Sequence, residues 1–283
     1  MSDDEVQRQA RSFGGVADAY DRGRPGYPAA AAAWLTGDEP LTVLELGAGT
    51  GKLTEQLVAL GHDVHATDPD EAMLEILRTH LPDVRTSVCG AEEIAAADSS
   101  YDVVVAAQSF HWFDHDLALP EIRRVLKPRG RLSMVWNLRD ERIPWIKKLG
   151  RVIGTEEQLV DPTELLQSSL RFIVVEQKTF KHWQIVDRRS IQDLVASRSN
   201  IAVLDDNARA MKMRELLELY DSYGRGMDGM QLHYETRCFR SRVVKSPVPD
   251  PSPSTNVDKP TDGEIPTSPP RDDDDGTLLI DFR

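Results

Sequence analysis

Three glycines occupy alternate positions between an apolar run and a segment with helical spacing. The stretch VLELGAGTGKLTEQL, residues 43–57, places Gly47, Gly49 and Gly51 directly after residues typical of a strand. Such loops hold cofactors because their backbone N–H groups can approach a ligand closely. An acid, Glu45, stands two residues before the first glycine. The sequence therefore predicts a cofactor-binding loop, and the spacing discriminates between possible cofactors.

The spacing disfavours a nucleotide phosphate loop. That motif is G-x-x-x-x-G-K-[ST], in which the final hydroxyl meets Mg²⁺. Here only three residues separate Gly47 from Gly51, and Leu53 stands where the hydroxyl is needed. We therefore interpret Lys52 as the first solvent-facing residue of the following helix and not as a phosphate ligand.

A dinucleotide loop fits less well than a loop for S-adenosylmethionine. The dinucleotide fingerprint is G-x-G-x-x-G, and its glycines pack beneath a pyrophosphate. The present order is G-x-G-x-G, and the carboxylate of Glu45 would repel a pyrophosphate. S-adenosylmethionine carries an ammonium and a sulfonium and no phosphate, so an acid at this position favours it. An NAD(P)-dependent oxidoreductase is the alternative enzyme.

Asp68 lies at the end of the second expected strand, 17 residues after Gly51. An acid in this position accepts hydrogen bonds from ribose hydroxyls in dinucleotide-binding folds. The same residue also fits the N-cap of the next helix, with Pro69 at the first helical position. The two interpretations are compatible, and both stay open at this point.

Strand-like and helix-like segments alternate between Leu41 and Trp136. The expected strands are LTVLEL, DVHAT, VRTSVC, YDVVVAAQ and RLSMVW, and the expected helices are KLTEQLVAL, EAMLEILRTH and LALPEIRRVL. Gly61 follows the first of these helices, where a C′ glycine belongs. This alternation predicts an α/β fold with a mostly parallel sheet and helices on both faces. The run VVVAA lacks alternation, as expected of a strand buried on both faces.

The flanking regions suggest three parts of the chain. Residues 1–40 should form a helical segment that covers the cofactor site. Residues 41–245 should form the main domain, with its core in 41–136 and the completion of the sheet and the acceptor side in 137–245. In the latter, FIVVEQKTFKHW and QLHYETRCFRSRVV read as strands, and RRSIQDLVASR and MRELLELYDSY as helices. Residues 246–283 are rich in Pro, Ser and Asp, which predicts a disordered acidic tail.

The composition limits the range of partners. The net charge of −13 argues against a nucleic-acid or anionic-membrane substrate. Two cysteines argue against a disulfide scaffold or a cysteine metal site. The N-terminal stretch has no apolar signal region, and no apolar run is long enough to cross a membrane. We therefore expect a cytoplasmic protein without a metal site, acting as a monomer or homodimer.

These motifs together resemble the class I S-adenosylmethionine-dependent methyltransferases. The resemblance rests on LELGAGTGKLT, HATDPDEAM, CGAEEI, YDVVVAAQSFHWFD and RRVLKPRG, covers roughly residues 10–140, and extends to the strand YETRCFR. The segments FGGVADAYDRGRPGYP and AQSFHWFD are most similar to the type-11 and trans-aconitate-type branch, which acts on small molecules. The resemblance implies a Rossmann-like sheet of seven strands with the last one antiparallel.

The resemblance also implies a role for each matching position. Gly47, Ala48, Gly49 and Gly51 would lie under the methionine part of the cofactor, and Glu45 would hold its amino group. Asp68 would bind the ribose, Pro69 or Met73 would flank the adenine, and Ala91 and Glu92 would lie at its edge. Gln108 would lie near the transferable methyl, and Tyr20 and Arg24 would reach over from the N-terminal segment, with Arg24 on the carboxylate. Met73 is equally typical of a core residue, and Glu92 of an acid at a helix N-terminus.

His111 is the candidate catalytic residue. It lies in SFHWFD, after a buried strand, at the sheet edge where α/β folds bind ligands. Methyl transfer from a sulfonium needs chiefly an in-line nucleophile, and a base matters only when the acceptor still carries a proton. His111 is therefore a base, a hydrogen-bond donor or an orienting group. Trp112 and Phe113 wall a substrate pocket or cover the sheet edge.

The predicted function is methyl transfer to a small-molecule O, N or carboxylate acceptor. Besides the NAD(P)-dependent oxidoreductase, a non-catalytic S-adenosylmethionine-binding protein that acts through partners is an alternative, and the acidic tail is its best support. No spaced motif in residues 137–245 identifies the acceptor.

Overall fold

The computed structural model describes residues 17–37, 39–154, 161–223 and 229–244. Residues 1–16 of the predicted N-terminal segment 1–40 and the whole predicted tail 246–283 lie outside these ranges. No described helix has the length and apolar character that a membrane crossing requires.

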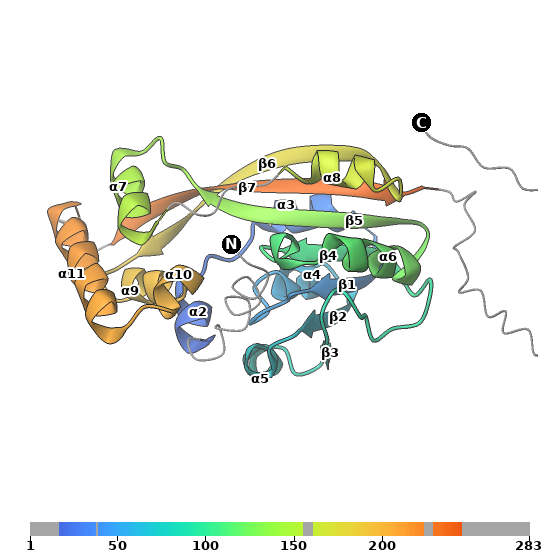
Figure 1. The fold of residues 1–283 in the computed structure, drawn as a ribbon, viewed down its shortest axis with the longest axis horizontal. Coiled ribbons are helices and arrows are strands. Elements are labelled where there is room, and N and C mark those ends of the chain that lie inside the picture. Colours follow the sequence, from blue (N-terminus) through green and yellow to red (C-terminus); the bar gives the residue numbers. More distant parts are fainter. Residues whose placement is uncertain (1–16, 38, 155–160, 224–228, 245–283) are drawn as a thin grey trace, which may run out of the picture. The chain divides into compact units, whose positions relative to one another are not determined.

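The described strands form one seven-stranded sheet in the order β3-β2-β1-β4-β5-β7-β6 (Figure 1). All neighbours are parallel except β7, which runs antiparallel to both β5 and β6. The predicted fold class, including the antiparallel last strand, is confirmed. The strands are β1 (Thr42–Leu46), β2 (Asp63–Asp68), β3 (Arg85–Val88), β4 (Tyr101–Ala107), β5 (Leu126–Arg139), β6 (Phe172–Val186) and β7 (Met230–Val243).

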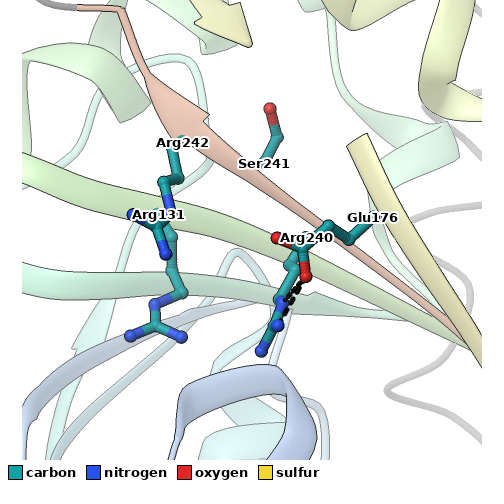
Figure 2. Close-up of a pocket in the computed structure, with 5 residues that line it drawn as sticks. All are labelled: Arg131, Glu176, Arg240, Ser241 and Arg242. Carbon is teal, nitrogen blue, oxygen red and sulfur yellow. Dashed lines mark hydrogen bonds and ion pairs between the residues drawn. The ribbon is translucent and has the colours of Figure 1, made fainter. Parts of the chain in front are cut away.

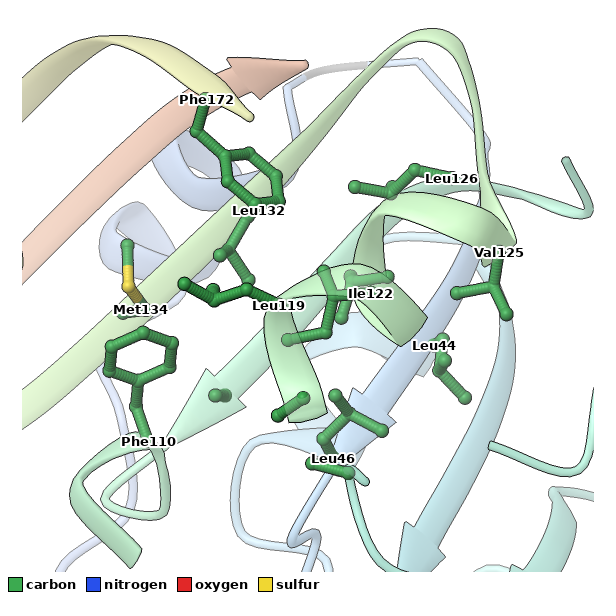
Figure 3. Packing of buried hydrophobic residues seen from close by; sticks show 14 of the residues in the cluster. Leu44, Leu46, Phe110, Leu119, Ile122, Val125, Leu126, Leu132, Met134 and Phe172 are labelled. Carbon is green, nitrogen blue, oxygen red and sulfur yellow. The ribbon is translucent and has the colours of Figure 1, made fainter. Parts of the chain in front are cut away.

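Helices cover both faces of the sheet. On one face, α6 (His115–Val125) and α8 (Pro162–Ser168) pack against the sheet, and Figure 3 shows Leu119 and Ile122 of α6 over Leu44 and Leu132. On the other face lie α3 (Ala29–Thr36), α4 (Thr54–Ala59) and α5 (Glu71–His80). Val104 and Ala106 of β4 face the first layer, while Val103 and Val105 face the second. This burial on both faces explains the unbroken apolar run of β4.

A second apolar cluster lies apart from these two layers. It combines α7 (Pro144–Ile153), α9 (Ser190–Ala196), α10 (Ser199–Ala202) and α11 (Asp206–Tyr223) with the adjoining ends of β6 and β7. In the chain, α7 follows β5, and α9–α11 lie between β6 and β7. These helices therefore lie at the edge of the sheet that is formed by the carboxyl ends of β4 and β5.

Two local predictions have different outcomes. Gly61 has φ +82° directly after the last turn of α4, so the predicted C′ glycine is confirmed. We predicted no element for residues 137–171, whereas α7 and α8 lie there. The helical spacing of Ile146, Leu149 and Ile153, all buried, was a usable signal for α7.

Candidate functional site

The glycine loop leaves the carboxyl end of β1 in a conformation that requires glycine. Gly47, Gly49 and Gly51 have φ values of +69°, +57° and +90°, all in the left-handed region. A Cβ atom at Gly47 would lie 2.5 Å from the Cβ of Ser109, which follows β4. The loop therefore combines an obligatory backbone conformation with a close approach between the ends of β1 and β4.

Asp68 holds this loop from the end of β2. Its two carboxylate oxygens accept hydrogen bonds from the N–H groups of Gly49 and Asp70, each at 2.9 Å. Helix α5 begins at Glu71, and its N-cap is Asp70, whose carboxylate accepts from the N–H of Ala72. The N-cap interpretation of Asp68 is therefore wrong. Burial raises the pKa of Asp68 to about 6, although the two N–H groups oppose this shift.

Glu45 lies beneath the loop on β1 with 1% of its surface exposed. The hydroxyl of Thr54 donates to its Oε2 at 2.7 Å, whereas its buried Oε1 has no hydrogen-bond partner among the described residues. Burial is the main cause that raises the pKa of Glu45 to about 8, and the charge of Asp68 adds to it. An incompletely paired buried carboxyl of this kind is costly unless a cation or donor completes it.

Helix α2 (Ala17–Gly23) brings the N-terminal candidates to the loop. The Tyr20 ring lies so close to Gly49 that a Cβ there would be 3.7 Å from its Cε1. The Arg24 guanidinium lies 5.0 Å from the Tyr20 ring centroid, and it donates to the hydroxyl and carbonyl of Ser197 at 3.1 Å. Arg24 therefore joins the loop region to the end of α9.

Lys52 forms an ion pair, although we predicted a solvent-facing residue at the start of the helix. Its ammonium pairs with the carboxylate of Asp21 in α2 at 2.9 Å, and only 27% of its side chain is exposed. The solvent-facing interpretation is therefore wrong, because α2 covers this side of the loop. The pair fastens α2 to the residue directly after Gly51.

Gln108 and Asn137 form the neighbouring part of the site, at the ends of β4 and β5. Gln108 has φ +57°, and its side-chain amide donates to the Asn137 carbonyl at 3.2 Å. The buried Asn137 amide donates to the Gly26 carbonyl at 3.0 Å and accepts from the hydroxyl of Thr236 at 2.7 Å. The sequence prediction missed Asn137, although an asparagine after the apolar strand RLSMVW was a signal.

The candidates for the adenine region have different surroundings. Met73 is buried on α5 and Pro69 is exposed. Ala91 packs into the core cluster beneath α6. The carboxylate of Glu92 accepts from the N–H of Asp114, the N-cap residue of α6, at 2.9 Å. Ala91 and Glu92 thus fix the segment after β3 against the start of α6.

His111 is exposed in the short 3-10 helix η2 (Phe110–Trp112) after β4. The indole N–H of Trp136 points to its Nδ1 at 3.4 Å. A neutral His111 that accepts on Nδ1 carries its proton on Nε2, so that nitrogen is a donor. Phe113 packs against the core cluster of α6, as a residue that covers the sheet does.

Comparisons with known proteins identify the family of the chain. The methyltransferase domain family matches residues 44–134, from β1 to β5. A methyltransferase of Mycobacterium tuberculosis is 41% identical over 236 residues, which are 82% of this chain and 96% of that protein. The chain belongs to the class I S-adenosylmethionine-dependent methyltransferases. A methyltransferase of Schizosaccharomyces pombe is 33% identical to this chain over 242 residues, which are 82% of this chain and 96% of that protein.

Solved methyltransferase structures share the fold. A type II methyltransferase from Anaeromyxobacter dehalogenans superposes with a TM-score of 0.58 at 22% identity, over 77% of this chain and 97% of that one. A methyltransferase from an antibiotic biosynthesis pathway of Anabaena variabilis gives 0.53 at 20% identity, over 74% and 95%. At these identities the likeness concerns the arrangement of the sheet and helices.

Proposed function

We propose that this methyltransferase transfers the methyl group of S-adenosylmethionine to a small-molecule O, N or carboxylate acceptor. The observation that carries the proposal is the pair of buried acids, Glu45 and Asp68, on the two sides of the glycine loop. Burial raises the pKa values of both acids, and a positive charge or a hydrogen-bond donor would stabilise their ionised forms, which supports a ligand that carries such groups. S-adenosylmethionine supplies both, through its ammonium and its ribose hydroxyls.

The residues present fit this cofactor. The unpaired Oε1 of Glu45 is an acceptor for the ammonium, directly or through water. Gly47, Ala48, Gly49 and Gly51 provide a backbone surface without side chains beyond a methyl group. Asp68 would hold the ribose, and Pro69 and Met73 would lie on the adenine side. Tyr20 of α2 and Arg24 directly after this helix would close the site, and Gln108 would lie next to the reacting methyl.

The bound cofactor supplies an electrophilic methyl on a sulfonium, and the protein holds the acceptor in position relative to that methyl. An in-line displacement gains most from an acceptor held at the correct distance and direction. The hydrogen bonds from Gln108 to Asn137 and from Asn137 to Gly26 fix the ends of β4 and β5 relative to the N-terminal segment. These contacts would keep the acceptor side rigid. We infer that the acceptor approaches from the side of α7 and α9–α11.

Glu45 counts against a dinucleotide, whereas Asp68 is compatible with the ribose of either cofactor. A dinucleotide would place its pyrophosphate at the glycine loop, near the buried carboxyl of Glu45, which is electrostatically unfavourable when that group is ionised. An activity screen over small acids, phenols and amines distinguishes an enzyme from a binding protein. The acceptor, a monomeric or homodimeric state and a cytoplasmic location remain predictions.

Cofactor binding should release a proton from Glu45. Its pKa in the free site is about 8, and a bound ammonium favours the carboxylate and so lowers that pKa. The affinity for S-adenosylhomocysteine should therefore increase as the pH rises from about 6.5 to 8, by at most about tenfold per pH unit. Calorimetric titration in buffers of different ionisation enthalpy measures both the affinity and the released proton. Glu45→Gln should remove the pH dependence, and a flat profile in the wild-type protein would contradict this role.

His111→Gln should lower kcat/KM by less than about tenfold, because we propose that His111 acts as a hydrogen-bond donor and glutamine keeps a donor. A general base would instead contribute a factor of about 10² to 10⁴. The measurement is the methylation rate with the acceptor found in the screen, as a function of pH. A loss above about 100-fold, together with loss of a pH-rate limb, would show that His111 is the base.

A further inference from the structure

A group of arginines surrounds a hollow away from the cofactor site. The hollow is a shallow depression that is open to solvent and lined by Arg131, Glu176, Arg240, Ser241 and Arg242. Figure 2 shows these residues on β5, β6 and β7. We call this feature the arginine hollow. Arg131 pairs in register with Val103 near the start of β4, whereas the cofactor candidates follow the end of that strand.

One of the three arginines is neutralised within the protein. Arg240 donates through Nε to the carboxylate of Glu176 at 2.7 Å and through Nη1 to the Trp34 carbonyl at 3.0 Å. Its guanidinium also lies 4.5 Å from the centroid of the Trp34 ring. Glu176 is therefore paired with Arg240, and among the described residues it is the only acid that lines the arginine hollow.

The other two arginines face one another without such a partner. Arg131 and Arg242 are directly opposite in the antiparallel pairing of β5 and β7. Within the described ranges of the chain, neither guanidinium has a hydrogen-bond acceptor or an ion-pair partner. Like charges directly opposite on neighbouring strands are destabilising. Arg131 is also half-buried, and burial lowers its pKa, with Arg240 and Arg242 adding to the shift.

A cluster of this kind is suited to an anion. A guanidinium presents several N–H donors in a plane and matches the spacing of oxygens on phosphate. An oxyanion between Arg131 and Arg242 would replace their repulsion by charge-assisted hydrogen bonds. We propose that the arginine hollow binds a phosphate-type oxyanion, either free phosphate or the terminal phosphate of an ester, independently of the cofactor.

The test uses the full chain and two probes, inorganic phosphate and glycerol 3-phosphate, titrated calorimetrically at constant chloride. Wild-type protein should bind one equivalent, with or without S-adenosylhomocysteine. Arg242→Gln and Arg131→Gln should each weaken binding about tenfold, because each removes a charge-assisted contact. Arg237→Gln is the matched control: it makes the same charge change on β7 but on the opposite face, and it should change affinity by less than about twofold.

Thermal unfolding gives a second measurement that does not depend on binding heat. In anion-free buffer of low ionic strength, Arg242→Gln should unfold at a temperature no lower than the wild-type protein, because it removes a repulsion. Added phosphate should raise the unfolding temperature of wild type more than that of the variant. Tighter binding of the ester would identify a phosphate ester as the ligand, and equal binding would identify free phosphate. No saturable binding, or an equal loss in Arg237→Gln, would overturn the proposal.

Discussion

Asp68→Ala should weaken the binding of S-adenosylhomocysteine by about 100-fold. The substitution removes an acceptor proposed for the ribose, and hydrogen bonds to a charged group contribute about 1.5–3 kcal/mol. It also releases the N–H groups of Gly49 and Asp70, which Asp68 now holds at 2.9 Å. The loop would then have to be ordered by the ligand, which costs further affinity. Calorimetric titration of purified, folded protein measures the change.

Asp70→Ala is the matched control for this prediction. Asp70 lies two residues away and caps α5 through the N–H of Ala72, but it does not contact the glycine loop in the described structure. Its removal should cost about 1 kcal/mol of stability and leave cofactor affinity within about threefold. Equal loss of affinity in both variants would show that α5, and not the carboxylate of Asp68, determines binding. Unchanged affinity in Asp68→Ala would remove Asp68 from the site.

Gly47→Ala should lower the free energy of unfolding by about 3 kcal/mol or more. A side chain at φ +69° costs about 1–2 kcal/mol, and the new Cβ would lie 2.5 Å from the Cβ of Ser109. Overpacking of this kind typically adds about 1–3 kcal/mol. Ser109 cannot move freely, because its hydroxyl donates to the Leu46 carbonyl at 2.7 Å. Denaturant unfolding at neutral pH measures the difference.

Gly61→Ala separates the cost of a side chain at positive φ from the cost of overpacking against Ser109. Gly61 has φ +82°, but a Cβ there would meet nothing within 4 Å, so this variant should show only the backbone cost. The double variant Gly47→Ala/Ser109→Gly should recover part of the stability, because it removes the Cβ of residue 109. If Gly47→Ala and Gly61→Ala lowered the free energy of unfolding by the same amount, the close approach between β1 and β4 would not contribute to the cost of a side chain at residue 47.

The order of the elements was predictable because it depends on local signals. The unbroken apolar run of β4 indicated burial on both faces, and Gly61 indicated the end of α4. The alternation of strands and helices then led to a parallel sheet. Each of these inferences uses only residues within one element and its flanking turn.

The contacts of the site were less predictable because they join distant segments. The ion pair of Lys52 depends on α2 lying over the loop, and the position of Asn137 depends on Gly26 and Thr236. Asp68 was assigned two compatible roles from the sequence, and only the start of α5 at Glu71 excluded one of them. Residue types indicated the kind of ligand, whereas the tertiary structure determines which side chains meet each other.

The central claim is that the glycine loop binds a cationic nucleoside ligand without phosphates. Calorimetric titration of the purified chain with S-adenosylhomocysteine and, separately, with NADH tests it most directly. We predict saturable binding of S-adenosylhomocysteine near one equivalent and no saturable heat with NADH. Saturable binding of NADH, with none of S-adenosylhomocysteine, would contradict the account.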